Sequence, residues 1–213
     1  MRFVIFVRHG QPDIPEGVYP DHGKMGLSSL GKIQAEEISK AFSNLRVDRI
    51  VSSHLPRAVQ TIKPLSLILG CEIDLVPNLR ERTFEELYGF DFDEIQSLHG
   101  PAIRREIEYG NTDLVELEKA ETLEESVVRL CKSMSDIVIS NIGTTIVSSH
   151  GGPHDWYLSS LSGTQFSGRL FKIGYGRATV ISYPDDSSKP YRVEGVNLPA
   201  SIAATYIESE AER

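Results

Sequence analysis

The fold is best predicted by residues 3–10, which read Phe-Val-Ile-Phe-Val-Arg-His-Gly. Five β-branched or aromatic residues in a row, 3–7, predict a strand buried on both faces, and such strands are typical of parallel sheets. The run stops abruptly at Arg8 and His9, and Gly10 allows the backbone to turn sharply behind them. Open parallel sheets bind ligands beyond the carboxyl ends of their strands. An arginine beside a histidine there suits an anionic, phosphorylated ligand, although a solvated strand end would show the same residues.

Length and composition set limits on the class of protein. A chain of 213 residues can form one large α/β domain, with or without an insertion, and its 40% hydrophobic and 24% charged residues are ordinary for a globular protein. The net charge of −8 argues against a nucleic-acid partner, and no apolar run approaches the roughly 20 residues of a membrane span. Any anion site must therefore be a local concentration of arginine, histidine and backbone N–H groups.

The cysteines and the N-terminus indicate the compartment. Cys71 and Cys131 lie far apart in the sequence and form no CxxC pair, so we expect free thiols in a reducing environment. The N-terminal apolar run is short and leads straight into Arg8, which does not fit a signal peptide. We expect a cytoplasmic protein.

Hydrophobic periodicity predicts alternating strands and helices after the first strand. Strands are expected at 49–52, 72–76, 144–148, 170–173, 177–183 and 191–196, the last as an antiparallel edge. Helices are expected from a cap at Ser28 or Ser29 to Leu45, over 55–69, over 122–141 and over 153–161. Thr122 and Glu125 form a capping box, and Pro64 should kink or split its helix. Residues 200–213 end in charge and are expected to fray.

The stretch from residue 77 to about residue 120 has a different character. Charged and aromatic residues dominate it, and we interpret it as a mostly helical insertion over the carboxyl edge of the sheet. The predicted fold is therefore a three-layer α/β/α domain over residues 1–213. Its sheet would be mostly parallel with an antiparallel edge, and the C-terminal strands could form a homodimer contact.

Polar residues follow three of the predicted buried strands. The strand ends carry Arg8-His9, Ser52-Ser53 and Ser149-His150, and these tips converge if the strands are parallel neighbours. Arg57 lies in the first turn of the helix after the second strand, where the backbone N–H groups also favour an anion. Two arginines and two histidines should thus face one point.

These blocks resemble the histidine phosphatase superfamily, which includes the cofactor-dependent phosphoglycerate mutases. The resemblance spans roughly residues 3–183. It rests on Arg8-His9-Gly10, on Leu27-Ser28 with Gly31 and Gln34-Ala35, on Ser52-Ser53-His54-Leu55 with Arg57-Ala58 and Gln60-Thr61, on Leu79 with Glu81, and on Ser149-His150-Gly151. The blocks occur in the family's order, and the fold that the family implies agrees with the one predicted from periodicity.

The resemblance assigns roles to the residues at the strand tips. His9 would be the nucleophile that forms a phosphohistidine, and Arg8 and Arg57 would hold the non-bridging phosphoryl oxygens. His150 would be cationic and complete this clamp, and Gln11 is a further candidate for phosphate contact. No metal or other cofactor is expected. The rival interpretation of His150 as a metal ligand with His154 is disfavoured because Gly151-Gly152-Pro153 should prevent a regular helical turn between them.

Glu81 would be the general acid and then the general base. It fits the family's Leu-x-Glu pattern, but Glu85 and Glu86 are close and remain alternatives. The chain also departs from the family. Gln11-Pro12-Asp13 replaces a small polar residue and an asparagine after the first histidine, and the Glu-Gly that often follows the acid loop is missing, which puts the lid geometry in doubt.

The resemblance is compatible with three functions, two of them enzymatic and one non-enzymatic. The mutase pattern after the first histidine is rich in Asn and Trp, and this chain has neither there, so we expect a histidine acid-type phosphatase that hydrolyses a small phosphorylated metabolite. The alternatives are a 2,3-bisphosphoglycerate-dependent phosphoglycerate mutase, for which Arg104-Arg105 would bind the carboxylate, and a non-catalytic phospholigand-binding protein. Specificity would lie in the insertion and in the loop 11–26.

Overall fold

The computed structural model describes residues 1–103, 107, 117, 120–164, 170–185 and 190–211. Within this part of the chain, six strands form one sheet in the order β3-β2-β4-β1-β5-β6. The strands are β1 (Arg2–Arg8), β2 (Arg49–Ser52), β3 (Ile73–Leu75), β4 (Thr144–Ser149), β5 (Ala178–Tyr183) and β6 (Arg192–Leu198). The first four are mutually parallel, whereas β5 is antiparallel to β1 and β6 is antiparallel to β5.

The central strands are buried on both faces, as their apolar runs predicted. Residues 3–7 of β1 are buried, and so is every residue of β4 and β5. The register pairs Arg8 with Ser149 and Ser52 with Ser148, so the tips of β1, β4 and β2 lie at the same edge of the sheet. This confirms the predicted convergence of the three strand ends.

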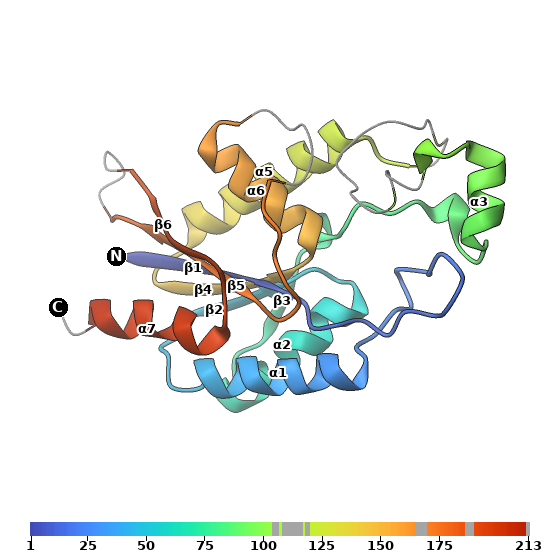
Figure 1. Cartoon of the computed structure of the whole chain (residues 1–213). Coiled ribbons are helices and arrows are strands. Elements are labelled where there is room, and N and C mark those ends of the chain that lie inside the picture. Colours follow the sequence, from blue (N-terminus) through green and yellow to red (C-terminus); the bar gives the residue numbers. More distant parts are fainter. Residues whose placement is uncertain (104–106, 108–116, 118–119, 165–169, 186–189, 212–213) are drawn as a thin grey trace.

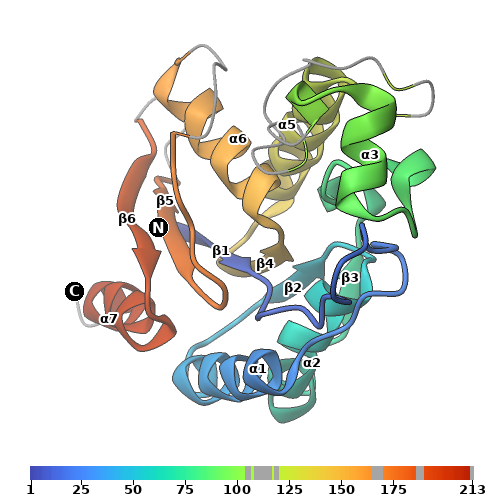
Figure 2. The same ribbon diagram turned by 45° about the vertical axis from the view of Figure 1, so that its right-hand side comes forward.

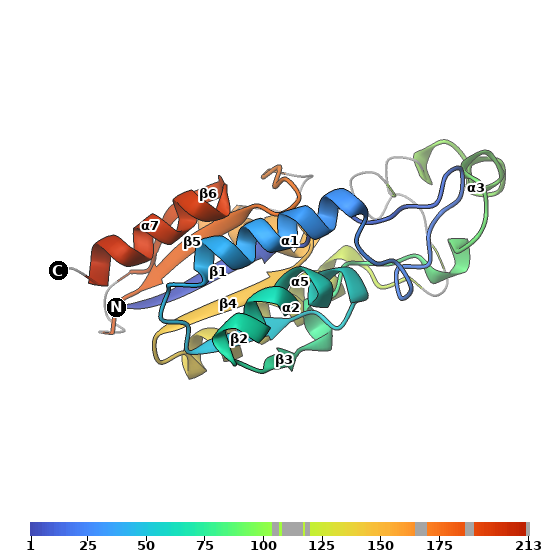
Figure 3. The same cartoon turned by 90° about the horizontal axis from the view of Figure 1, so that it is seen from below.

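Helices cover both faces of the sheet (Figure 1, Figure 3). One face carries α1 (Ser29–Phe42), α2 (Pro56–Leu69) and α7 (Ala200–Ala211), and the other carries α5 (Leu123–Ser140) and α6 (Gly151–Ser162). The predicted Ser28 cap and the Thr122–Glu125 capping box are both present. Pro64 lies inside α2 without splitting it. The three-layer α/β/α architecture is therefore confirmed.

Three sequence predictions were wrong. Residues 170–173 form no strand. The predicted frayed tail is α7, because Ala203, Ala204 and Ile207 recur at helical spacing and are buried in the core formed by α1 and the sheet. The turn that we expected Gly151-Gly152-Pro153 to prevent is the first turn of α6, where the His154 N–H donates to the His150 carbonyl at 3.1 Å. Proline tolerates this position because it needs no donor there.

The segment after β3 lies beyond the carboxyl edge of the sheet (Figure 2). It contains two 3₁₀ turns, η1 (Pro77–Leu79) and η2 (Glu85–Leu87), and the helix α3 (Phe92–His99). A separate apolar cluster joins Phe84, Leu87 and Ile95 to Tyr19 of the loop 11–26. The second part of the predicted insertion, residues 104–119, lies mostly outside the described residues, and so do Arg104 and Arg105. The helical character of that part stays a prediction. None of the described helices is both long and apolar enough to cross a membrane.

Candidate active site

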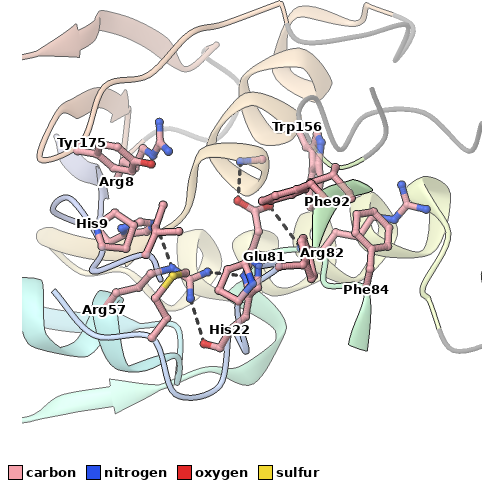
Figure 4. Close-up of a pocket in the computed structure, with 17 residues that line it drawn as sticks. Arg8, His9, His22, Arg57, Glu81, Arg82, Phe84, Phe92, Trp156 and Tyr175 are labelled. Carbon is pink, nitrogen blue, oxygen red and sulfur yellow. Dashed lines mark hydrogen bonds between the residues drawn. The ribbon is translucent and has the colours of Figure 1, made fainter. Parts of the chain in front are cut away.

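A pocket of about 290 Å³ opens where the tips of β1, β2 and β4 meet the loop 11–26 and the segment after β3. Figure 4 shows Arg8, His9 and Arg57 at one side of this pocket and Phe84 and Phe92 at the other, with Glu81 between them. The three basic residues come from the end of β1 and the first turn of α2, which the sequence predicted to converge.

His9 is buried and held in one tautomer. Its Nδ1 lies 2.7 Å from the carbonyl oxygen of Gly10, and a carbonyl can only accept, so Nδ1 carries the proton. Nε2 is then the unprotonated nitrogen, and its lone pair accepts a hydrogen bond from Nε of Arg57 at 3.2 Å. Burial, followed by the charges of Arg57 and Arg8, holds the pKa of His9 well below its ordinary value. A neutral imidazole with an available Nε2 is the form that a nucleophile requires.

Arg57 is fully buried in the first turn of α2, and its guanidinium spans the pocket floor. Besides the bond to His9, Nη1 donates to the carbonyl oxygen of His22 at 3.1 Å and Nη2 lies 3.2 Å from Nδ1 of His22. Burial lowers its pKa to about 10, and the nearby carboxylate of Glu81 opposes this shift. Arg57 therefore remains a cation at neutral pH, and it can bind phosphoryl oxygens.

Arg8 lies on the other side of His9. Its guanidinium carbon is 4.0 Å from the ring centroid of Tyr175, and Nη1 donates to the carbonyl oxygen of Ile173. The segment 170–175 thus fixes the position of this arginine through Ile173 and Tyr175, although its first part does not form the predicted strand. Stacking on an aromatic ring orients a guanidinium without neutralising it.

His150 packs edge-on against the ring of His9. The resemblance to the family implies that it is a cation. Its Nε2 is 2.9 Å from Oγ of Ser53, its ring centroid is 5.0 Å from that of His9, and it is fully buried. Burial, followed by Arg57 and His9, lowers its pKa well below the ordinary value. These surroundings therefore favour the neutral form, and the cationic His150 stays a prediction. Its Nδ1 has no hydrogen-bond partner among the described residues.

Glu81 enters the pocket from the turn after η1. Its Oε2 accepts a hydrogen bond from the backbone N–H of Gly152 at 3.1 Å, at the start of α6. Glu81 lines the pocket, whereas neither Glu85 nor Glu86 is among the lining residues. The geometry therefore favours Glu81 over its two neighbours for any acid–base role.

Gln11 is not among the described residues that line the pocket, and its phosphate contact stays a prediction. Its Oε1 accepts a hydrogen bond from Oγ of Ser28 at 3.0 Å, and its backbone N–H donates to Oε1 of Gln34 at 2.7 Å. Gly31 lies so close that a Cβ there would be 2.1 Å from the Gln11 carbonyl oxygen. Thr61 similarly accepts a hydrogen bond from the N–H of Gly10 at 2.9 Å. These motif residues hold the turn after His9 in place.

His154 is a core residue. Its ring stacks on Phe6 with centroids 4.3 Å apart, and neither ring nitrogen has a hydrogen-bond partner in the described part of the chain. Burial, followed by the charge of Arg8, lowers its pKa to about 3. No group of three or more His, Cys, Asp or Glu residues suited to a metal ion occurs among the described residues. The arrangement gives no support to a metal site at His150 and His154.

Several lining residues were not predicted from the sequence. They are mainly aromatic or basic: Tyr19, His22, Arg82, Phe84, Phe92, Trp156 and Tyr175. They come from the loop 11–26, the segment after η1, α6 and the turn before β5, and none belongs to a regular strand tip. The only available signal was the cluster of aromatic residues after residue 77, because loop positions follow no periodicity.

Comparison with known proteins identifies relatives of the same kind. The model of the histidine phosphatase superfamily (branch 1) matches residues 4–194. A relative named "Putative phosphoserine phosphatase 2" from Hydrogenobacter thermophilus is 28% identical over 153 residues, which are 71% of this chain and 74% of that protein.

Solved structures share the fold. A mycobacterial glucosyl-3-phosphoglycerate phosphatase in complex with VO3 is 22% identical, with a TM-score of 0.74 over 93% of this chain and 100% of the other. Bacillus stearothermophilus YhfR is 18% identical, with a TM-score of 0.79 over 95% of this chain and 100% of the other. At these identities the likeness establishes the architecture, and the chemistry has to be argued from the site.

Proposed function

Because the chain belongs to the histidine phosphatase superfamily (branch 1), we propose that it hydrolyses small phosphomonoesters through a phosphohistidine on His9. The observation that carries this proposal is the state of His9. Its Nδ1 proton is engaged by Gly10, so Nε2 presents a lone pair beside two arginines, with a carboxylate lining the same pocket. A protein that only binds phosphorylated ligands needs neither the lone pair nor the acid.

In the first step Nε2 of His9 attacks phosphorus and the ester oxygen leaves. The hydrogen bond from Nε of Arg57 must yield as the N–P bond forms, and that N–H is then free to donate to a phosphoryl oxygen. Arg8 and Arg57 balance the charge on the non-bridging oxygens. The departing oxygen needs a proton, which protonated Glu81 supplies.

In the second step water attacks the phosphohistidine and Glu81 accepts a proton from it. The N–P bond breaks, Nε2 recovers its lone pair and inorganic phosphate leaves, so Glu81 is protonated again for the next cycle. His150 is not among the described residues that line the pocket, but its ring centroid lies 5.0 Å from that of His9. A dianionic phosphoryl group nearby would raise the pKa of this imidazole, which its surroundings otherwise keep low, and would so restore the cation that the family resemblance implies.

The pocket walls support an apolar organic group on the substrate. Beyond the phosphate-binding end, the described lining residues are mostly apolar or aromatic, and Tyr175, Phe92 and Ile14 leave part of their surface accessible to a ligand. Arg82 is the further basic residue of the lining. A planar or aliphatic phosphomonoester would bury more surface against these walls than a sugar phosphate would.

A paired assay on one preparation tests the proposal. One arm follows phosphate release from 1-naphthyl phosphate, phosphoserine and 3-phosphoglycerate, and the other follows conversion of 3- to 2-phosphoglycerate with and without 2,3-bisphosphoglycerate. We expect phosphate release without isomerisation, with the highest kcat/KM for the naphthyl ester. Bisphosphate-dependent isomerisation would instead establish a mutase. Preference for phosphoserine would contradict the apolar substrate.

A further inference from the structure

His22 belongs to none of the motifs that mark the active site, yet its backbone oxygen and its ring Nδ1 both contact Arg57. Its backbone oxygen accepts a hydrogen bond from Nη1 of Arg57 at 3.1 Å, and Nη2 lies 3.2 Å from its Nδ1. A guanidinium can only donate, so Nδ1 accepts and the imidazole is neutral with its proton on Nε2. His22 therefore presents two hydrogen-bond acceptors, its backbone oxygen and Nδ1, to the two terminal nitrogens of Arg57.

Aromatic rings fix the imidazole in turn. His22 stacks on Tyr88 with centroids 6.1 Å apart and planes at 12°, and the ring of Tyr19 lies 5.5 Å away. Tyr19 and Tyr88 also stack on each other, with centroids 5.9 Å apart. Tyr88 belongs to the segment after β3 and Tyr19 to the loop 11–26. The imidazole is thus held between two segments that are far apart in the sequence.

The contacts use three of the five N–H groups of Arg57. Nε–H goes to His9, and one N–H from each terminal nitrogen goes to His22. The plane of the guanidinium is therefore set from both sides. The two remaining N–H groups are left for phosphoryl oxygens when the substrate binds, and Nε–H joins them as the N–P bond forms. An arginine with this many buried bonds loses little further freedom when phosphate binds.

We propose that His22 is a positioning residue that orients Arg57 for the phosphoryl group and links the loop 11–26 and Tyr88 to the reacting centre. The inference rests on the proposed phosphatase function. Because His22 also lines the pocket, the competing explanation is direct contact with the organic part of the substrate. The two explanations make different predictions for inorganic phosphate, which has no organic part. Inorganic phosphate would bind Arg57 and so depend on its orientation, but it has no leaving group that could contact His22.

The experiment compares His22→Phe with His22→Asn. Phenylalanine keeps the stack on Tyr88 but cannot accept the Arg57 hydrogen bond, whereas the amide oxygen of asparagine can take the place of Nδ1. His99→Asn, at the end of α3 and outside the pocket lining, is the control. The readouts are the inhibition constant of inorganic phosphate, and kcat and KM for 1-naphthyl phosphate and phosphoserine. Thermal unfolding checks that each variant folds.

For His22→Phe we expect weaker phosphate inhibition and a lower kcat/KM, by roughly 10- to 100-fold, and by the same factor for both esters. His22→Asn should recover most of both values. In an Arg57→Ala background the His22→Phe change should have no further effect. An unchanged phosphate inhibition constant, or losses that differ strongly between the two esters, would overturn the positioning role. Failure of the proposed function is distinguishable, because the unmodified protein would then release no phosphate.

Discussion

Nε2 of His9, the proposed nucleophile, accepts a hydrogen bond from the arginine that we expect to bind the substrate's phosphoryl group. This contact, 3.2 Å between Nε of Arg57 and Nε2 of His9, orients the imidazole, while burial, followed by the charges of Arg57 and Arg8, lowers its pKa. Glu81 lines the same pocket and is fixed by the backbone of α6. The two residues have separate chemical tasks, and substitutions can separate them.

Glu81→Gln tests the acid. A glutamine cannot give a proton to the leaving oxygen, so hydrolysis of an alkyl phosphate should slow by roughly 10²–10⁴-fold. The loss in kcat/KM, which reports only the steps up to phosphoenzyme formation, should be much smaller for p-nitrophenyl phosphate, because its leaving group needs no proton in the first step. Glu85→Gln is the matched control, because this neighbour does not line the pocket, and it should leave both rates unchanged. Equal losses on both esters would argue against leaving-group protonation by Glu81.

The sequence predicted the site residues that follow strands or open helices, but it did not predict the site residues that lie in loops. His9, Arg57 and His150 follow buried apolar runs or open a helix, so periodicity alone places them at one edge. Gln11 has the right place in the motif, but Ser28 satisfies its amide locally. His22 could not be found because its contact with Arg57 spans 35 residues of sequence and depends on how a loop folds back.

Among the elements, the first turn of α6 shapes the site most directly. Its backbone N–H at Gly152 holds Glu81, and a Cβ at this position would lie 2.2 Å from Oε1 of Glu81 and 2.9 Å from the ring of Trp156. The absence of a side chain is therefore what allows the carboxylate to approach the helix terminus. Gly151 similarly leaves room for Arg8, whose guanidinium carbon would be 3.1 Å from an added Cβ.

Gly152→Ala should displace the Glu81 carboxylate and lower kcat by roughly 100-fold, because a shift of about 1 Å is enough to misplace a catalytic group. The helix itself should survive, since alanine favours helical backbone. Steady-state kinetics with an alkyl phosphate measures the effect. Ser160→Ala, near the other end of α6, is the control and should behave like the unmodified enzyme. A fully active Gly152→Ala variant would show that the position of Glu81 is not critical.

Element boundaries were predictable wherever a cap or a continuous apolar run marked them. Ser28, Thr122 and the run 3–7 marked such boundaries, and their elements formed as expected. The helix α7 was not predicted because its buried face is a narrow stripe of mainly alanines, and the charged residues at its end suggested a frayed tail. Residues 170–173 were mistaken for a strand, although in the folded chain the carbonyl of Ile173 binds Arg8.

The fold withdraws four histidines from solvent: His9, His150 and His154 are buried, and His22 is partly buried. Burial is the largest cause of the lowered pKa in each case. An unfolded chain binds these protons near pH 6.5, whereas the folded chain does not. The unfolded state therefore holds more protons at acid pH, and the free energy of unfolding must fall as the pH drops below about 6.5.

His154→Phe isolates one of these groups, because His154 lies in the core against Phe6 and outside the pocket lining. With a folded pKa of about 3, the histidine should cost about 2 kcal/mol of stability at pH 5 relative to pH 7. The variant should lose that much less stability over the same pH interval in denaturant unfolding. The idea fails if the variant and the unmodified protein lose equal stability between pH 7 and pH 5.

Trapping the phosphoenzyme tests the central claim most directly. The protein is mixed with a rapidly cleaved aryl phosphate, quenched in alkali, which preserves a phosphorus–nitrogen bond, and analysed by intact mass and by peptide mapping. The account predicts one added phosphoryl group on the peptide that carries His9, accumulation of this species in Glu81→Gln, and none in His9→Ala. Phosphate release with no trapped species in Glu81→Gln, or a His9→Ala variant with near-normal turnover, would contradict the phosphohistidine mechanism.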